Sequence, residues 1–503
     1  MLARIISYTT LGLAALPVEV EVDAAPGLPT LTIVGLPDQT VKEARERVHS
    51  AIINSQFRLP SQRFIVNLAP ADVKKAGGSF DVAIALGLLA ASGQVDPSSL
   101  ASVAALGELA LDGSVRPIHG ILPVALAARQ SHRRLFVPAA NAPEAAMVEG
   151  ADVVPITSLS EAIDILAGLR PAASARAPQP SPHSTISSLD FADVKGQAHA
   201  KRALEVAVAG GHHALLLGPP GSGKTMLAQR LPTIQPALSF EEALETTAIH
   251  SVAGLLDGAS SLMPRPFRAP HHTSSATSLI GGGPLPKPGE VSLAHHGVLF
   301  LDELPEFHRD ALESLRQPLE AGLVHVARTK RSLPFPARFM LVAAMNPCIC
   351  GFLTDPNRRC RCSSTQIQRY LAKISGPLLD RIDLHIDVPA VSFDVITHAP
   401  SGETSAQIRA RVIEAQAWRR NRGQKHTNAQ LSSKELKTYC ELTTEALKLL
   451  KSAMQELNLS ARSYTKILKI SRTIADLAES NQILPEHIAE AIQYRSLDRQ
   501  LWA

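Results

Sequence analysis

The residues best suited to chemistry in this chain form one glycine-rich stretch, Gly218-Pro219-Pro220-Gly221-Ser222-Gly223-Lys224-Thr225. An apolar run at 214–217 precedes it and a helix-like segment at 226–231 follows, which is the order of a phosphate-binding loop, or P-loop. Glycine lets backbone N–H groups turn inward around the β- and γ-phosphates of a nucleotide. Lys224 would place a positive charge on those oxygens, and Thr225 would hold Mg²⁺ through its hydroxyl. The stretch therefore predicts a nucleotide site whose cofactors are ATP and Mg²⁺.

Two later apolar runs end in the polar residues that such a site needs. Residues 297–301 predict a buried parallel strand that ends at Asp302 and Glu303, and residues 339–345 predict another that ends at Asn346. Ligands of open α/β sheets bind at the carboxyl ends of the strands. We expect Asp302 to hold Mg²⁺, Glu303 to polarise the attacking water, and Asn346 to orient that water beside the γ-phosphate.

Two arginines could complete an ATPase site. Arg381, in the segment Leu-Leu-Asp-Arg-Ile-Asp at 378–383, could neutralise charge in the transition state, acting from a neighbouring subunit. Arg462 opens a helix that would belong to a C-terminal lid. Each arginine taken alone is more typical of a surface salt bridge, but their order after the P-loop favours catalytic roles.

Four of the five cysteines form two Cys-x-Cys pairs, Cys348 with Cys350 and Cys360 with Cys362. Residues i and i+2 of an extended chain point to the same side, so each pair could present two thiolates to one ion. The two pairs predict a structural Zn²⁺ site with no open position for a substrate. Free or redox-active cysteines remain the alternative, because Cys-x₂-Cys is the commoner spacing in zinc sites.

Basic residues gather in two segments that could contact a polynucleotide. Residues 324–335 alternate, carry Lys330 and Arg331 at a basic tip, and predict a β-hairpin ahead of the strand that ends at Asn346. The basic tip of such a hairpin could follow backbone phosphates without reading sequence. The cysteine segment adds three further candidates for DNA contacts, Arg358, Arg359 and Arg361. The alternative for both segments is solvated surface charge.

The segment between Leu231 and Gly297, roughly 65 residues long, is too long for a simple connection. Its glycine and proline density predicts a mobile loop. It also holds two histidine pairs, at 271–272 and 295–296. Because neighbours on a strand point in opposite directions, we expect these histidines to pack or form hydrogen bonds rather than bind a metal.

Several stretches together resemble a known family. They are Val34-Gly35-Leu36-Pro37-Asp38, Asn67-Leu68-Ala69-Pro70-Ala71-Asp72, Phe267-Arg268-Ala269-Pro270-His271-His272-Thr273 and Met345-Asn346-Pro347-Cys348. With the P-loop, they make the whole chain similar to the ComM/YifB group of magnesium-chelatase-like AAA+ ATPases, known as DNA branch-migration helicases of natural transformation. The resemblance implies a hexameric ring that hydrolyses ATP, with single-stranded or branched DNA and recombination proteins as partners.

The expected fold is α/β and multidomain. Residues 1–170 resemble the Lon-protease-like domain of ChlI proteins, an α+β domain, and residues 171–188 form a linker rich in proline, alanine and serine. Residues 189–400 would form the AAA+ ATPase core, with a zinc knuckle at 348–362. Residues 401–503 would form a helical lid, in which Ser432 and Glu435 offer a capping box.

The Lon-like domain lacks one of the two groups that proteolysis needs. A Lon-type protease uses a serine nucleophile activated by a lysine. Ser79 could match the nucleophile, although Phe80-Asp81 suggests a register that differs by one residue, and Leu122 stands where the lysine would be. Since an aliphatic side chain cannot accept a proton, we expect a non-proteolytic module that guides assembly or DNA.

Composition bounds these expectations without deciding among them. A chain of 503 residues suggests about three domains, and a net charge of +4 is only mildly basic. No apolar run approaches a membrane span. The N-terminus loosely imitates a signal peptide, but the alternation at 18–23 predicts a half-buried strand instead, so we expect a cytoplasmic protein. Two other functions compete with the DNA motor: the ATPase subunit of a magnesium chelatase, and a protein-remodelling ATPase.

Overall fold

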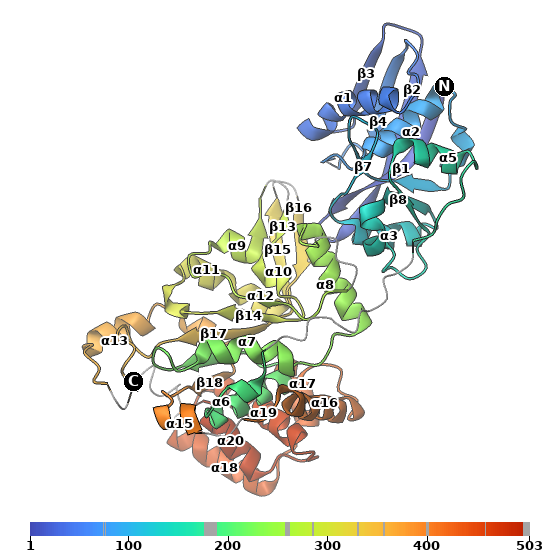
Figure 1. The fold of residues 1–503 in the computed structure, drawn as a ribbon. Helices are drawn as coiled ribbons and strands as arrows, with labels where there is room; N and C mark the ends of the chain where they lie inside the picture. The colour runs from blue at the N-terminus through green and yellow to red at the C-terminus, as the bar shows by residue number, and fades with distance from the viewer. Residues whose placement is uncertain are drawn as a thin grey trace. The chain divides into compact units, whose positions relative to one another are not determined.

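The computed structural model describes residues 1–73, 75, 77–175, 189–256, 262–283, 286–328, 331–355, 358–398, 402–457 and 459–495 (Figure 1). The chain divides into two compact units, one of Met1–Ser184 with Ala243–Met263 and one of Thr185–Glu242 with Pro264–Ala503. The sequence assigns all of 189–400 to the ATPase core, so this division differs at 243–263. These residues belong to the first unit because they pack and hydrogen-bond there: the Gly120 N–H donates to the Ser251 carbonyl at 3.2 Å.

A mixed seven-stranded sheet forms the centre of the first unit, in the order β3-β4-β2-β1-β5-β8-β9. Its strands are β1 Leu2–Leu11, β2 Ala14–Ala25, β3 Thr30–Val34, β4 Arg63–Ala69, β5 Val103–Ala105, β8 Arg134–Pro138 and β9 Val153–Ile156. The half-buried strand predicted at 18–23 is confirmed, because Val18, Val20 and Val22 are fully buried in β2. A small antiparallel pair, β6 Glu108–Leu109 with β7 Val115–Arg116, lies outside this sheet.

Helices pack on this sheet because packing removes their apolar faces from water. They are α1 Gln39–Asn54, α2 Asp81–Ala91, α3 Ile121–Gln130, α4 Ala142–Ala145 and α5 Leu159–Leu166, and α8 Phe240–Ala253 adds its residues from 243 onward. Helix α2 is buried along its whole length and packs against β1 and β2. A Cβ atom on Gly87 of α2 would lie 2.7 Å from Cγ2 of Val22, so glycine permits this close approach.

The second unit is built on a five-stranded parallel sheet in the order β11-β14-β17-β10-β18. The strands are β11 Phe267–Arg268, β14 Val298–Leu301, β17 Met340–Met345, β10 Ala214–Leu217 and β18 Leu384–Asp387. The strands predicted at 297–301 and 339–345 are thus confirmed, and both are buried throughout. Because all five strands run in one direction, their carboxyl ends meet at one edge, and their amino ends meet at the opposite edge.

Helices α6 Ala198–Gly210 and α7 Lys224–Ile234 pack beside this sheet, and a helical lid follows it (Figure 1). The lid consists of α16 Ser405–Asn421, α17 Ser433–Tyr439, α18 Thr444–Glu456, α19 Ala461–Leu477 and α20 Pro485–Gln493. Buried residues of the sheet, of α6 and of the lid form one hydrophobic core. The predicted capping box is confirmed: Ser432 Oγ accepts from the Glu435 N–H, and Glu435 accepts from the Ser432 N–H.

The described parts of the segment from 231 to 297, residues 231–256, 262–283 and 286–297, contain several helices and strands. These are α8, β11, α9 Ala276–Ile280, the short hairpin of β12 Gly281–Gly282 with β13 Lys287–Pro288, and α10 Glu290–Leu293. A bidentate ion pair between Arg268 and Glu290, at 2.7 and 2.9 Å, ties β11 to α10. Long-range pairs of this kind are not visible as local spacing, so glycine and proline content alone could not indicate these elements.

The second unit contains further helices and strands. They are α11 Arg309–Ser314, α12 Arg316–Ala321, β15 Leu323–Arg328, β16 Arg331–Pro336, α13 Ser364–Leu371, α14 Gly376–Leu379 and α15 Phe393–His398. Strands β15 and β16 pair antiparallel, which confirms the hairpin predicted at 324–335. Among the residues described, no helix is both long and apolar enough to cross a bilayer.

Candidate nucleotide site and cysteine cluster

The P-loop connects β10 to α7, as the sequence predicts. Gly223 caps the amino end of α7 with φ of +92°, a left-handed conformation that side chains other than glycine adopt at a cost. Gly218 follows β10 directly, and a Cβ atom there would lie 2.1 Å from the Val388 carbonyl oxygen. Glycine is therefore required at one end of the loop by backbone conformation and at the other by lack of space.

Lys224 joins the P-loop to the end of β17. Its Nζ donates to the carbonyls of Gly218 at 2.7 Å and Pro219 at 2.9 Å, and to Asn346 Oδ1 at 3.1 Å. The side chain is buried, and this burial lowers the pKa of Lys224, while the nearby carboxylates of Asp302 and Glu303 oppose the shift. The ammonium group thus sits where it can reach phosphate oxygens held by the loop.

Thr225 and Asp302 form a second link, which joins the end of the P-loop to the end of β14. Thr225 Oγ1 donates to Asp302 Oδ2 at 2.7 Å, and the Glu303 N–H donates to Asp302 Oδ1 at 2.9 Å. A hydroxyl and a carboxylate are the hard oxygen ligands that Mg²⁺ takes in phosphate-binding sites, so the residues present fit this ion.

Glu303 has a partner that the sequence did not single out. His272 Nδ1 lies 3.2 Å from Glu303 Oε2, and both side chains are partly exposed. The two residues meet because β11 and β14 are parallel neighbours, so the segments that leave their carboxyl ends share one edge of the sheet. The sequence predicts only that His272 packs or forms a hydrogen bond, and its ion-pair partner could not be read from local spacing.

A pocket of about 590 Å³ lies beside the P-loop and is lined by residues 196–199, 387, 389–392 and 395. Gln197 joins its wall to the loop, because its Nε2 donates to the carbonyls of Ser222 at 3.1 Å and Pro389 at 2.6 Å. Apolar side chains, such as Val391 and Val395, line much of the remainder. Such a pocket suits the flat, apolar faces of a nucleobase whose phosphates lie on the P-loop.

The two predicted catalytic arginines lie away from this P-loop. Arg381 lies in the short segment between α14 and β18, so it stands at the amino-end edge of the sheet, opposite the P-loop. It forms an ion pair with Glu320 and donates to the Pro377 carbonyl. Arg462, at the start of α19, is 73% exposed and donates to Asp380 Oδ2 at 2.5 Å.

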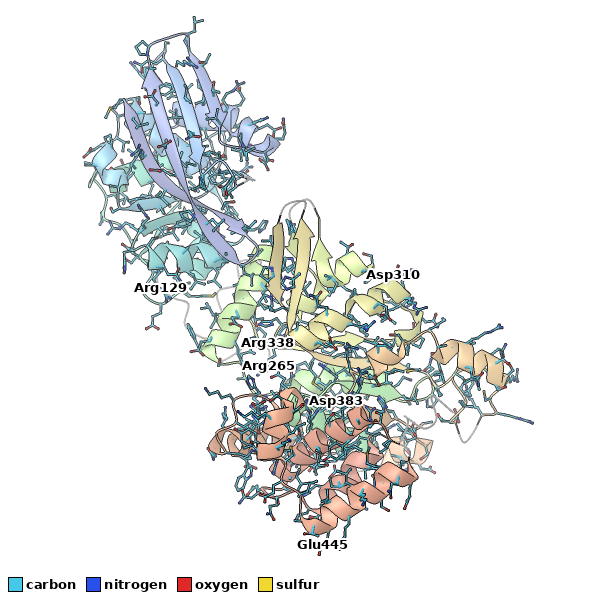
Figure 2. All side chains as sticks on the ribbon, turned by 180° about the vertical axis from the view of Figure 1, so that it is seen from behind. Arg129, Arg265, Asp310, Arg338, Asp383 and Glu445 are labelled. Atoms are coloured by element: carbon cyan, nitrogen blue, oxygen red, sulfur yellow. The ribbon has the colours of Figure 1, made fainter. Side chains whose placement is uncertain are left out.

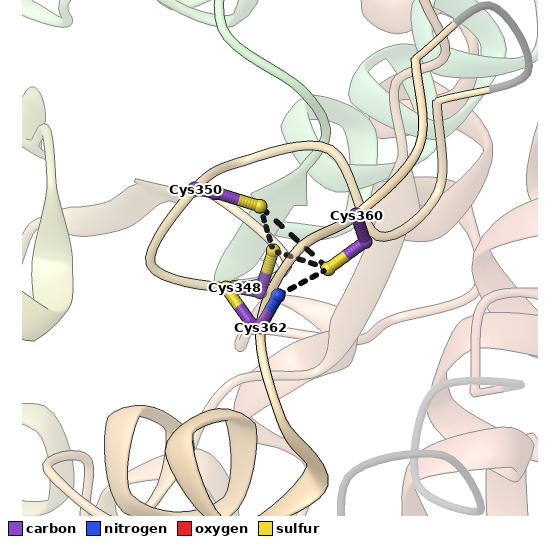
Figure 3. A group of neighbouring side chains, drawn as sticks. All are labelled: Cys348, Cys350, Cys360 and Cys362. Atoms are coloured by element: carbon purple, nitrogen blue, oxygen red, sulfur yellow. Dashed lines mark hydrogen bonds between the residues drawn. The ribbon is translucent and has the colours of Figure 1, made fainter.

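The four cysteines of the two Cys-x-Cys pairs converge on one point (Figure 3). The Sγ atom of Cys348 lies 3.4 Å from that of Cys350 and 3.7 Å from that of Cys360, and the last two are 3.6 Å apart. A tetrahedral site with Zn–S bonds of about 2.3 Å has S···S edges of about 3.8 Å, whereas a disulfide requires about 2.05 Å. All four are free thiols, so the donor set fits Zn²⁺.

The surroundings of the thiols shift their pKa values in different directions. Burial raises the pKa of Cys348 to about 12. Backbone N–H groups of Arg361 and Phe352 point at Cys350 and lower the pKa of its thiol to about 6, which favours a thiolate there. A thiolate that binds a metal commonly accepts hydrogen bonds from nearby backbone N–H groups, so these contacts also suit a metal ligand.

The cysteine cluster touches the P-loop. Gly351, with φ of +82°, lies so close that a Cβ atom on it would be 2.5 Å from Cδ of Pro220. On its other side the cluster begins two residues after Asn346. The cluster is therefore joined to the nucleotide site by one packing contact and by the chain itself.

The predicted DNA contacts are described only in part. Lys330 lies outside the described residues, as does the side chain of Arg331. Arg358, Arg359 and Arg361 are exposed on the cysteine segment, and the Arg358 guanidinium stands 5.1 Å from the centre of the Phe352 ring. The segment thus presents positive charge to solvent while its thiols turn inward.

The chain matches three models of known families. "Magnesium chelatase, subunit ChlI" matches residues 190–396, "Subunit ChlI of Mg-chelatase" matches 20–141, and "Magnesium chelatase, subunit ChlI C-terminal" matches 402–495. Lon protease 2 of Bacillus subtilis is 32% identical over 142 residues, which cover 26% of this chain and 25% of the protease. The expected fold class is confirmed: a Lon-like N-terminal part, an AAA+ core and a helical C-terminal part.

Relatives from several bacteria match along nearly the full length of the chain. Competence protein ComM of Haemophilus influenzae is 46% identical over 504 residues, covering 99% of this chain and 98% of ComM. YifB of Escherichia coli is 44% identical over 495 residues, covering 98% of this chain and 96% of YifB. The chain therefore belongs to the ComM/YifB family of magnesium-chelatase-like AAA+ proteins.

Proposed function

We propose that this chain is an ATP-hydrolysing motor that assembles as a hexameric ring and moves along DNA, acting as a branch-migration helicase on recombination intermediates during natural transformation. One observation carries the ATPase part of the proposal. Lys224 contacts Asn346 while Thr225 contacts Asp302, so groups suited to phosphate, metal and water converge at one sheet edge.

Each residue of the site has a proposed role. The P-loop amides and Lys224 bind the phosphates, and Thr225 and Asp302 hold Mg²⁺, which would neutralise charge on the phosphate oxygens. Glu303 accepts a proton from the attacking water, and Asn346 orients that water. Arg381 stands at the opposite sheet edge, so it would serve the nucleotide of a neighbouring copy. Arg462, on the lid helix α19, would couple the position of the lid to the same interface.

The DNA part of the proposal draws on three supports. In the sequence, Lys330 falls between β15 and β16 and Arg331 is the first residue of β16, and the cysteine segment adds three exposed arginines, Arg358, Arg359 and Arg361. Contacts of this kind track phosphates and are independent of base sequence. The third support is the printed name of the Haemophilus influenzae relative, a competence protein.

We further propose that Cys348, Cys350, Cys360 and Cys362 hold a structural Zn²⁺ ion. The support is the near-tetrahedral spacing of their sulfur atoms. The Lon-like unit would be non-proteolytic, because Leu122 is an aliphatic residue buried in α3 and cannot serve as a base.

The test is unwinding of three-stranded and four-way DNA junctions by the purified protein, with and without ATP. The proposal requires ATP-dependent strand separation that the Lys224→Ala variant lacks. A protein that hydrolyses ATP but neither binds nor unwinds DNA would contradict the DNA motor. The family descriptions favour a second candidate, the ATPase subunit of a magnesium chelatase, which requires activity with a porphyrin and a partner subunit and indifference to DNA.

A further inference from the structure

A cavity of about 750 Å³ lies at the amino-end edge of the five-stranded sheet, opposite the P-loop. Residues that immediately precede β10, β14, β17 and β18 line it, namely His213, Gly297, Phe339 and Asp383. The end of α12 and the segment that follows α16 close its sides. Arg265, Arg338 and Asp383, labelled in Figure 2, all belong to its wall.

Positive charge prevails on this wall. The described lining holds twice as many lysines and arginines as acidic residues: Arg265, Arg338, Arg381, Arg419, Lys425 and Lys469 against Glu242, Glu320 and Asp383. Each acid already has a cation. Glu242 lies 3.6 Å from Arg265, Glu320 pairs with Arg381, and Asp383 pairs with Lys466 at 3.4 Å, a residue outside the wall.

Some of the guanidinium nitrogens are buried without an acceptor. Nε and Nη1 of Arg419, and Nε of Arg381, are inaccessible to solvent and have no hydrogen-bond partner among the described residues. Arg419 lies near the end of α16 and lines the cavity. A buried N–H of a cation that is left without an acceptor carries a large desolvation cost, so a rotation of the Arg419 side chain that turns these donors into the cavity, toward the oxygen atoms of an anion, would be favourable.

We propose that this cavity is a second polyphosphate-binding site, in which Arg419 is a principal ligand. Arginine presents a planar fork of donors that matches phosphate oxygens. The volume exceeds what a single phosphate fills, and the excess of cations suits a chain of two or three phosphates. The site is distinct from the P-loop, because the two lie at opposite edges of one sheet.

Two sources could supply this chemistry: a free polyphosphate, or the polyphosphate of a nucleotide held by the P-loop of another copy. The second source rests on the proposed ring, and the first does not. Binding is therefore measured on the Lys224→Ala variant, in which the P-loop lacks its phosphate-binding cation. Failure of the proposed ATPase function leaves this measurement unaffected.

The probe is inorganic tripolyphosphate, titrated calorimetrically into the full-length Lys224→Ala protein. Adding Arg419→Gln should weaken binding about tenfold or more, because a charge-assisted hydrogen-bonding ligand is lost. Adding Lys425→Gln, at an exposed position of the wall, should also weaken it without threatening the fold. Arg409→Gln is the matched control, since Arg409 is exposed on the same helix as Arg419 but does not line the cavity.

The second arm measures ATP-dependent self-assembly of the Arg419→Gln and Arg409→Gln chains with an intact Lys224, by mass photometry. Tripolyphosphate binding that depends on Arg419 assigns the site to a free polyphosphate. Loss of assembly in Arg419→Gln alone, with no free binding, assigns it to the nucleotide of another copy. The proposal is overturned if neither readout responds to Arg419, or if Arg409→Gln causes equal losses in both.

Discussion

Arg462 donates a hydrogen bond of 2.5 Å to Asp380, the residue that directly precedes Arg381. One turn later on α19, Lys466 pairs with Asp383 at 3.4 Å and donates to the Ile382 carbonyl at 2.7 Å. The lid helix therefore holds the turn on both sides of Arg381. A shift of α19 would move Arg381, which gives the lid a physical route to the arginine proposed to act on another copy.

Replacing Glu303 by glutamine should separate ATP binding from hydrolysis. Glutamine keeps the size of the side chain but cannot accept a proton, so the turnover number should fall by about 10²–10⁴-fold. ATP affinity should remain, because Lys224 and Thr225 are untouched, whereas Lys224→Ala should lose both. Steady-state ATPase assays and nucleotide titration check this, and normal turnover in Glu303→Gln would assign the proton transfer elsewhere.

Mixing inactive variants tests whether Arg381 serves another copy. Arg381→Ala should lower ATP hydrolysis by about 10³-fold, the smaller effect known for arginine fingers. Arg381→Ala chains have an intact P-loop and Lys224→Ala chains have an intact Arg381, so some mixed interfaces are complete. Hydrolysis should return as the two are titrated together. The idea fails if activity stays at background at every ratio.

His272 is expected to position Glu303 rather than to react. Replacing it by alanine should lower the turnover number about tenfold while leaving the KM for ATP unchanged, because the contact at 3.2 Å is to the carboxylate alone. His271→Ala is the matched control, since His271 Nδ1 lies against Thr273 Oγ1 instead. Equal effects of the two changes would point to a purely structural role.

Removing the metal should weaken ATP binding at the nucleotide site. Cys360→Ser should release about one Zn²⁺ ion per chain, since a Cys₄ site binds one ion. ATP affinity should fall severalfold, because Gly351 packs against Pro220 of the P-loop. Elemental analysis and nucleotide titration measure the two effects, and Cys440→Ser is the control outside the cluster. Zinc-free protein from zinc-supplemented cells would contradict the metal assignment.

His213 should make the second unit sensitive to acid. Burial lowers the pKa of His213 to about 4, against the opposing charge of Asp383, and its Nδ1 accepts the Leu341 N–H at 3.0 Å. Lys466 and His212 nearby also disfavour the protonated ring. Below about pH 6.5 the unfolded chain therefore binds a proton that the folded chain resists, and stability falls as the pH drops towards 4.

At pH 5 this difference amounts to about 2 kcal/mol relative to pH 7.5. Urea unfolding followed by the fluorescence of Trp418, on α16, measures it. His213→Gln should remove that part of the pH dependence. An unchanged dependence in the variant would assign the acid sensitivity to other groups.

Features formed by residues close together in the sequence could be predicted, whereas contacts between residues far apart in the sequence could not. The P-loop and Asp302 could be predicted because a strand, a loop and a few polar residues are local, and parallel strands bring their ends together by rule. The contacts of Gln197 and His272 could not, because each reaches a residue far away in the chain through the packing of the sheet. The cysteine geometry needed only the two short pairs, since the loop between them is short.

The opposite positions of the P-loop and Arg381 on one sheet constrain how copies can meet. A contact that joins them uses two different surfaces, so it is heterologous and each added copy exposes the same two surfaces again. Any open assembly would keep one idle phosphate loop at one end and one idle arginine at the other. Only an assembly that closes on itself gives every hydrolytic centre both a phosphate loop and an arginine.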